Sequence, residues 1–366
     1  MNSKTDISET MTIKDVVNVL EEIAPLRYQE SYDNSGLIVG NPNALFIKAL
    51  ICLDSTEEVI EEAITKGCNL VIAHHPIVFG GLKKITGKNY VERTVIKAIK
   101  NNISIYASHT NLDSVHIGVS RKICDKIGLQ DCRILAPQKG LLKKITVLCP
   151  VEQADAVRIA LISAGAGQTG DYPETSFNLL GVSTAVNSTT SQYLQFGQIK
   201  IEILFAVHLE GKVLQALFNL PGGRNLSYNL STIENAYSRI GLGMIGELPQ
   251  EQDPSAFLNH LKTAMQTKCI RHTKLFRKKV RTIAVCGGAG FSLLPHAIAQ
   301  KADVYITADM KYHEFFDAEN HLILADIGHY ESEQFTIELL KDLLTEKITN
   351  FAAVLTQVNA NPVYYL

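Results

Sequence analysis

The stretch Leu70-Val71-Ile72-Ala73-His74-His75-Pro76 decides the fold. Its four consecutive apolar residues are typical of a strand that is buried on both faces. The segment before it, 55–66, has apolar residues at helical spacing, and Gly67 marks the end of that helix. A helix that leads into such a strand favours a parallel sheet with crossover helices, so we expect an α/β fold.

The same alternation extends outward from this stretch in both directions. Before residue 138 the pattern predicts strands at 46–53, 69–73 and 103–107, and helices at 13–24, 55–66, 90–100 and 117–127. It returns later and predicts helices at 257–265, 292–300 and 333–344, with strands at 282–285, 304–307 and 322–325. We therefore expect mixed or parallel sheets that are flanked by helices.

The middle of the chain has a different order of elements. Strands are expected at 145–149, 179–186 and 198–206, and helices at 151–164 and 210–219. The order strand, helix, strand, strand, helix is typical of a small ferredoxin-like α+β unit. The sequence thus predicts one α/β domain in two parts, 1–137 and 235–366, with an inserted domain at 138–234.

Composition limits the classes of function. The chain has 366 residues and a formal net charge of −2, which argues against general affinity for nucleic acid or anionic membranes. Its apolar runs are all shorter than the about 20 residues that span a bilayer, and the polar first ten residues lack a signal-peptide core. The seven cysteines form no C-x-x-C pair, so we expect reduced thiols and a cytoplasmic protein.

Imidazole and carboxylate side chains follow three of the expected strands. They are His74 and His75, then His109 with Asp113, and later His329 with Glu333. Ligands of an open α/β sheet bind beyond the carboxyl ends of its strands, and these side chains suit a divalent transition metal. The sequence therefore predicts a metal site that is assembled from three segments.

Each segment also has a structural interpretation. The adjacent histidines can be hydrogen-bonded core or surface residues, and Asp113 can cap the helix that follows it. Glu333 can interact with the dipole at a helix N-terminus, whereas Glu331 is expected to face solvent. Taken together, these ligands are too many for one tetrahedral zinc with an open position. They fit two ions about 3.5–4 Å apart that share a carboxylate, and Zn, Fe or Mn would suit them.

Two glycine-containing turns accompany these segments. Gly287-Gly288-Ala289-Gly290 lies between an expected strand and an expected helix, where it can serve as a tight packing turn or as a phosphate cradle. It matches neither the dinucleotide-binding nor the Walker motif, so the packing turn is favoured. Asp33-Asn34-Ser35-Gly36 is a turn signal whose polar side chains can reach into a site.

These motifs resemble a known family, the Nif-three-like proteins, which are also labelled GTP cyclohydrolase I type 2. The resemblance covers roughly residues 11–135 and 235–345, and the middle segment resembles the inserted PII-like domain of the longer members. The segments that carry it are Tyr32-Asp33-Asn34-Ser35-Gly36-Leu37-Ile38-Val39-Gly40, Ala73-His74-His75-Pro76, His109-Thr110-Asn111-Leu112-Asp113, Val285-Cys286-Gly287-Gly288-Ala289-Gly290, the stretch 302–313, and Asp326-Ile327-Gly328-His329-Tyr330-Glu331-Ser332-Glu333.

The resemblance implies both a site and an assembly. His75 and Asp113 would hold one metal ion, His74 and His329 would hold the other, and Glu333 would bridge the two. His109 would lie beside the pair. The resemblance also implies a toroidal homohexamer whose metal sites face an internal cavity.

Metal-dependent hydrolysis is the leading expectation, with two ions that stabilise the charge developing on the substrate. The family label suggests a small-molecule substrate such as a purine nucleotide. His109 is expected to act as general acid or base, and the alternatives are a metal ligand or a hydrogen bond that orients Asp113. Two other functions stay open. One is a non-catalytic metal-binding or regulatory hexamer that acts through partner proteins, and the other is a transferase that acts on a metal-held cofactor precursor.

Overall fold

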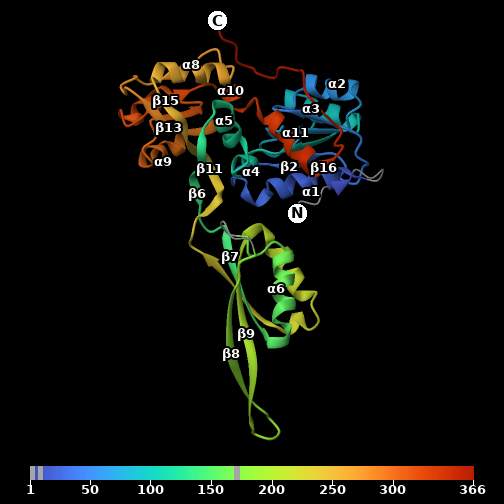
Figure 1. The fold of residues 1–366 in the computed structure, drawn as a ribbon. Helices are drawn as coiled ribbons and strands as arrows, with labels where there is room; N and C mark the ends of the chain where they lie inside the picture. Colours follow the sequence, from blue (N-terminus) through green and yellow to red (C-terminus); the bar gives the residue numbers. More distant parts are fainter. Residues whose placement is uncertain (1–4, 7–10, 169–173) are drawn as a thin grey trace. The chain divides into compact units, whose positions relative to one another are not determined.

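The computed structural model describes residues 5–6, 11–168 and 174–366, and it divides into two compact units (Figure 1). The first unit combines residues 1–136 with 239–366, and the second is Pro137–Ser238. The second unit ends a few residues beyond the predicted boundary at 234. Strand β10 (Ser227–Ile233) ends before the predicted boundary, and the observed boundary lies within the first residues of the next strand, β11 (Tyr237–Gln252).

Among the described residues, one half of the first unit is a five-stranded sheet with the order β17-β3-β4-β5-β2. Strands β17, β3, β4 and β5 run parallel, and β2 is antiparallel to β5. Every residue of β3, β4 and β5 is buried, as their apolar sequences predict. The bounds are β2 Gly36–Val39, β3 Ala49–Cys52, β4 Leu70–Ala73, β5 Ser104–Ala107 and β17 Ala353–Leu355.

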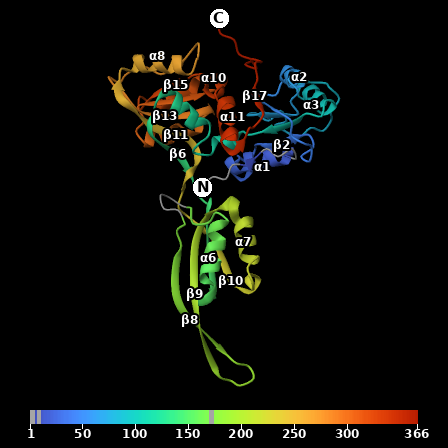
Figure 2. The same ribbon diagram turned by 45° about the vertical axis from the view of Figure 1, so that its right-hand side comes forward.

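Helices α2 (Glu57–Thr65) and α3 (Tyr90–Lys100) lie side by side on one face of this sheet (Figure 2). Thr56 begins α2 by accepting a hydrogen bond from the amide of Val59 at 3.3 Å. The remaining elements of this half are α1 Ile13–Ile23, η1 Leu26–Tyr28, α4 Thr110–Asp113, α11 Thr336–Lys347 and the short parallel pair β1 Thr5–Asp6 and β16 Ile348–Thr349, and helix α5 (Val119–Ile127) leads into the other half.

The other half of the first unit is a six-stranded sheet with the order β12-β15-β14-β13-β11-β6 in the described part of the chain. Its three central strands run parallel, and β11 and β12 are antiparallel to their neighbours β13 and β15. Helices α5 and α8 pack on one face, and α9 packs on the other. The bounds are β6 Gln130–Gln138, β12 Arg271–His272, β13 Val280–Ala289, β14 Val304–Ala308, β15 Ile323–Asp326, α8 Pro254–Ala264, η5 Phe291–Leu293, α9 Leu294–Ala299, η6 Tyr312–Ala318 and α10 His329–Glu333.

The expected α/β class with mixed sheets and flanking helices is therefore confirmed. Two differences matter for the site. The helix expected at 333–344 is two helices, and His329 and Glu333 are the first and last residues of the earlier one, α10. The long strands β6 and β11 were not expected, because β11 is interrupted by glycines at 241, 243 and 246 and has no continuous apolar run.

Every helix in the described residues is too short or too polar to span a bilayer. All seven cysteines lie in described residues and are free thiols.

The strands described in the second unit form an antiparallel sheet with the order β10-β7-β9-β8. Along the chain the order is strand, helix, strand, strand, helix, strand, which is that of a ferredoxin-like unit. The unit has its own core between the sheet and its two helices, in which Phe205 and Leu217 are buried. The bounds are β7 Leu142–Pro150, η2 Val151–Gln153, α6 Ala154–Ser163, β8 Phe177–Val186, β9 Tyr193–Ala206, η3 Val207–Leu209, α7 Glu210–Phe218 and η4 Gly223–Asn225.

We predict that the second unit can be removed. Its first and last strands are neighbours, and Leu142 pairs with Ile233, so its two ends lie close together. Replacing residues 139–236 with a short flexible linker should leave a first unit that folds cooperatively. Thermal unfolding and elemental analysis of the deletion variant, beside the full chain, would test this. Aggregation of the variant would instead mean that the second unit supports the sheet that contains β6 and β11.

Candidate metal centre

The expected site residues lie at strand ends of the first unit or in the short helices that follow them. His74 and His75 directly follow β4, His109 follows β5, and two residues separate His329 from the end of β15. Asp113 ends the single-turn helix α4 that begins after His109, and Glu333 ends α10. Both sheets therefore contribute to one cluster, as the sequence predicts from ligand chemistry at the carboxyl ends of strands.

Sheet register fixes the positions of the first histidines. Ala73 of β4 is opposite Ala107 of β5, so His74 and Ser108 leave the sheet at the same level. The amide of His75 donates to the carbonyl of Leu53, at 2.9 Å, which holds the segment against the end of β3. The two adjacent imidazoles lie with ring centroids 4.9 Å apart.

The Nδ1 atom of each of the four histidines has an oxygen partner at 2.7–2.8 Å. The partners are the carbonyl of Ser108 for His74, Asp54 for His75, Asp33 for His109 and Asp309 for His329. In a neutral ring this contact places the proton on Nδ1 and leaves the lone pair on Nε2. Histidines that bind metals are held in the same way by carboxylates or carbonyls.

The side chain of Glu333 lies at the centre of the cluster and is only 3% exposed. Its Oε2 is 3.0 Å from Nε2 of His75 and 3.1 Å from Nε2 of His329. Its Oε1 is 3.8 Å from Nε2 of His74, and that nitrogen is 3.7 Å from Oδ1 of Asp113. One carboxylate therefore faces two groups of side chains through its two oxygens.

Two atoms of the cluster test whether a metal would fit. Nε2 of His74 and Oδ1 of Asp113 are buried, and neither has a hydrogen-bond partner. Leaving such atoms unsatisfied costs free energy, and native structures rarely do so without a reason. Both atoms are metal ligands by type, so a cation would satisfy them together. The groups His74–His75–His109 and His75–His329–Glu333 each have ligand atoms close enough to hold an ion.

The charges in the cluster also favour a cation. Burial, and next the charge of Glu333, raise the pKa of Asp113. Burial disfavours the charged form of Glu333 as well, but the nearby imidazoles of His329 and His74 outweigh it and lower the pKa of Glu333. Two carboxylates with opposed pKa shifts in a buried space indicate strong mutual repulsion. A divalent cation between them would remove that repulsion.

The glycine-rich turn makes room for Glu333. A Cβ atom on Gly288 would lie 2.4 Å from Oε1 of Glu333, and a Cβ atom on Gly287 would lie 2.7 Å from Val119. Gly288 also has a φ of +64°, which favours glycine. Its amide donates to the hydroxyl of Ser332 at 2.9 Å. The turn therefore serves close packing, as the sequence favoured.

Other site residues were missed by the sequence interpretation. Asp54 and Asp309 follow β3 and β14, so the rule that found the histidines could also have found them. Asp33 belongs to the turn that was expected to reach into a site, and it holds both His109 and Thr110. The expectation that Glu331 faces solvent is wrong, because this residue is 6% exposed.

The two structural alternatives for the carboxylates can also be judged. Asp113 does not cap the following helix, because α5 begins after Gly118. Glu333 is the last residue of α10 and lies just before the N-terminus of α11, so the interaction with a helix N-terminal dipole remains an alternative for this residue.

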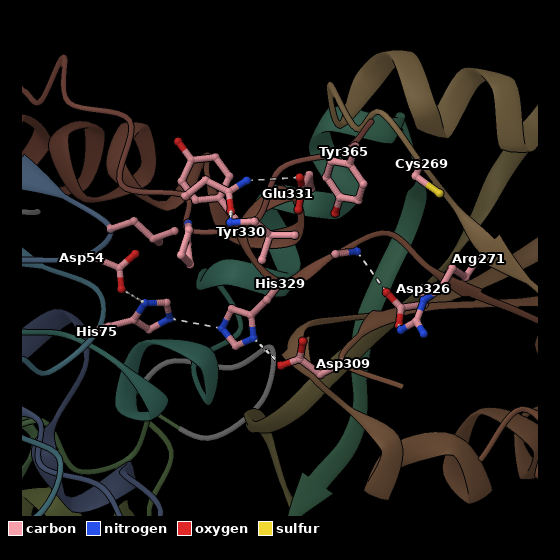
Figure 3. Close-up of a pocket in the computed structure, with 15 residues that line it drawn as sticks. Asp54, His75, Cys269, Arg271, Asp309, Asp326, His329, Tyr330, Glu331 and Tyr365 are labelled. Carbon is pink, nitrogen blue, oxygen red and sulfur yellow. Dashed lines mark hydrogen bonds and ion pairs between the residues drawn. The ribbon is translucent and has the colours of Figure 1, made fainter. Parts of the chain in front are cut away.

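A cavity of about 490 Å³ lies on the side of the cluster formed by His75 and His329 (Figure 3). The figure shows His75 and His329 pointing toward each other, with Asp54 and Asp309 on their outer sides. Such a volume is typical of a small-molecule site. The cluster thus combines metal-binding side chains with room for a ligand.

Comparison with known proteins identifies the family. A sequence model of Duf34/NIF3 (NGG1p interacting factor 3) matches residues 11–362. The chain belongs to the Duf34/NIF3 family. It is 33% identical to a GTP cyclohydrolase 1 type 2 homolog of Halalkalibacterium halodurans, over 96% of this chain and 98% of that protein. It is 30% identical to the homolog of Bacillus subtilis, over 94% of each chain.

Solved structures of the Duf34/NIF3 family agree with this fold. A Bacillus cereus protein related to NIF3 superposes with a TM-score of 0.86 at 33% identity, covering 98% of this chain and all of the other. The Staphylococcus aureus protein SA1388 has a TM-score of 0.79 at 28% identity, with the same coverage. Both likenesses extend over the second unit as well as the first.

We predict that Glu333→Ala removes all bound metal. Glu333 is the side chain that contacts the histidines of both sheets, so its loss separates the two ligand groups. Elemental analysis after dialysis would measure the metal content. Glu338→Ala is a matched control, because Glu338 forms ion pairs with Lys122 and Lys126 at the surface. Full metal occupancy in Glu333→Ala would rule out a central role for this carboxylate.

A second prediction concerns the carboxylates behind the imidazoles. Asp54→Asn should lower the metal affinity of the chain by about 10- to 100-fold, because the amide orients His75 less firmly and makes it a weaker ligand. Competition with a metal indicator would measure the affinity. Asp342→Asn, on the exposed side of α11, should leave it unchanged. Equal affinities for Asp54→Asn and the wild type would show that the contact with Asp54 does not tune the ligand.

Proposed function

We propose that this chain is a metal-dependent hydrolase that binds two divalent ions through His74, His75, Asp113, His329 and Glu333. The observation that carries the proposal is the convergence of imidazole Nε2 atoms from two sheets on the two oxygens of one buried carboxylate. Two groups of ligands around a shared carboxylate are the arrangement of dinuclear hydrolytic sites. Zn, Fe or Mn would suit these side chains.

The contacts support a particular division of the ligands. His75 and His329 share Oε2 of Glu333, whereas His74 and Asp113 are grouped on the side of Oε1. This differs from the pairing that the family resemblance implied, in which His75 went with Asp113 and His74 with His329. The proposed division follows from strand position, since His75 points toward α10 and His74 toward α4.

When bound, two such ions would polarise the substrate and make water more acidic, which is what hydrolysis at neutral pH requires. The protein side chains would supply proton transfer. The Nδ1 atom of His109 is 2.8 Å from Asp33, and the ring lies edge-on to His74 and His75 at centroid distances of 5.3 and 5.4 Å. Nε2 of His109 is then the atom that would accept or deliver a proton beside the ions.

Asp33 suits a role as the residue that orients His109. Burial disfavours its charge, but hydrogen bonds from His109 and Thr110 outweigh burial and hold the pKa of Asp33 below its usual range. A carboxylate that stays ionised beside Nδ1 of an imidazole fixes the tautomer of that ring and stabilises its protonated form. The alternative in which His109 only orients Asp113 is disfavoured, because its Nδ1 contact is with Asp33.

The cavity of about 490 Å³ beside His75 and His329 supports a small-molecule substrate. The name carried by the relatives, GTP cyclohydrolase 1 type 2 homolog, favours a nucleotide within that class. Purification without added metal, followed by elemental analysis and a panel of phosphoester and cyclohydrolase substrates, would test the proposal. Two ions per chain with turnover of one substrate class would support it.

A chain that binds metal but turns over no substrate would favour the non-catalytic alternative, a metal-binding or regulatory assembly that acts through partner proteins.

The homohexamer and the cytoplasmic location remain predictions from the sequence. The mass of the metal-loaded chain in solution would test the hexamer.

For His109 we predict that His109→Gln retains both ions and lowers any hydrolytic rate by about 10²- to 10⁴-fold, the usual size of a general acid–base contribution. Rate assays on the metal-loaded variant, with metal content measured on the same sample, would check this. His296→Gln, on the exposed side of α9, is the control. Loss of a metal ion from His109→Gln at neutral pH would make His109 a ligand rather than an acid or base.

A further inference from the structure

Residues 356–365 form an extended segment, here called the strap, that begins at the five-stranded sheet. The amide of Thr356 donates to the carbonyl of Ile51 at 2.9 Å, next to the pairing of β17 with β3. The amide of Gln357 donates to Oε1 of Glu62 at 2.9 Å, and the hydroxyl of Thr356 donates to the other oxygen of Glu62. This end of the strap is therefore fixed to the half of the first unit that carries His75.

The far end of the strap contacts Glu331, in the other half of the first unit. The amide nitrogen of Asn361 donates to Oε1 of Glu331 at 3.3 Å. The hydroxyl of Tyr365 lies near the same carboxylate. Gly328 leaves room for Glu331 and Tyr365 to approach each other. A Cβ atom on Gly328 would lie 2.3 Å from Oε2 of Glu331 and 2.9 Å from the Tyr365 hydroxyl.

The strap forms one wall of the cavity beside the candidate metal centre. The residues that line this cavity include Asn361, Pro362, Val363 and Tyr365 from the strap, opposite His75 and His329. Figure 3 shows Glu331 and Tyr365 on one side of the cavity, with Asp54, His75, His329 and Asp309 below them. A ligand in this cavity would therefore lie between the strap and the imidazoles of His75 and His329.

We propose that the strap is a cover over the substrate cavity, and that Glu331 is the positioning residue that holds this cover closed. The inference rests on the proposed function, because the cavity matters only if it leads to a metal centre. It deepens that function by assigning control of access to residues that lie outside the ligand set.

The contacts suit a cover that can open. Glu331 is buried, and it contacts the strap at the side-chain amide of Asn361 and near the hydroxyl of Tyr365. Water replaces such contacts when they break, so their net contribution to stability is much smaller than their gross strength. The other end of the strap, by contrast, continues the pairing of β17 in the sheet. Opening would therefore release residues 359–365 and leave residue 356 in place.

The test compares Tyr365→Phe and Asn361→Ala with Tyr364→Phe in the metal-loaded full chain. Tyr364 is the neighbouring tyrosine, and its side chain is 83% exposed, so its hydroxyl is a matched control. Hydrogen–deuterium exchange of peptides from 356–365 should be about tenfold faster in the first two variants, as expected when a contact with a buried carboxylate is lost. Tyr364→Phe should match the wild type. Equal exchange in all four proteins would refute the role of Glu331.

The second measurement is the rate at which EDTA removes the bound metal. An open strap should speed removal several-fold in Tyr365→Phe and Asn361→Ala, while the metal content before EDTA stays that of the wild type. Unchanged rates of metal removal would overturn the proposal that the strap covers the cavity. So would variants that already lack metal before EDTA is added. A wild-type chain that takes up no metal would refute the proposed function instead, and the exchange rates would still decide whether Glu331 holds the strap.

Discussion

The structure of this site depends on the burial of one carboxylate, that of Glu333. A buried charge of this kind is tolerated only where compensating groups surround it. The imidazoles of His74, His75 and His329 supply that compensation, and they come from strand ends in two different sheets. The need to bring them together explains why Gly288 has no side chain, since even one carbon there would collide with the carboxylate.

Much of this arrangement could be predicted from the sequence, because the signals are local. Four apolar residues before His74 indicate a buried strand, and an imidazole directly after such a strand must emerge at its carboxyl end. The same reasoning applies to His109 after β5. The class of fold followed from the alternation of such strands with amphipathic helices, and the ligand set followed from the residue types at the strand ends.

The remaining features depend on contacts that no local pattern encodes. Asp54 and Asp309 do follow strands, but an acid at such a place is common in ordinary turns, and the pattern does not tell that these two contact His75 and His329. The burial of Glu331 depends on a strap that follows it by some thirty residues. Strand β11 has glycines where apolar residues would have revealed it, and its place in the sheet is set by neighbours on both sides.

The ligands are spread widely along the chain. His75 and Glu333, which touch through Nε2 and Oε2, are 258 residues apart in sequence. During synthesis the amino-terminal histidines therefore leave the ribosome well before the carboxylate that completes their site, with the whole second unit in between. The cluster can therefore form only after Glu333 has been synthesised. A chain that stops before α10 carries the amino-terminal histidines without the carboxylate that they contact.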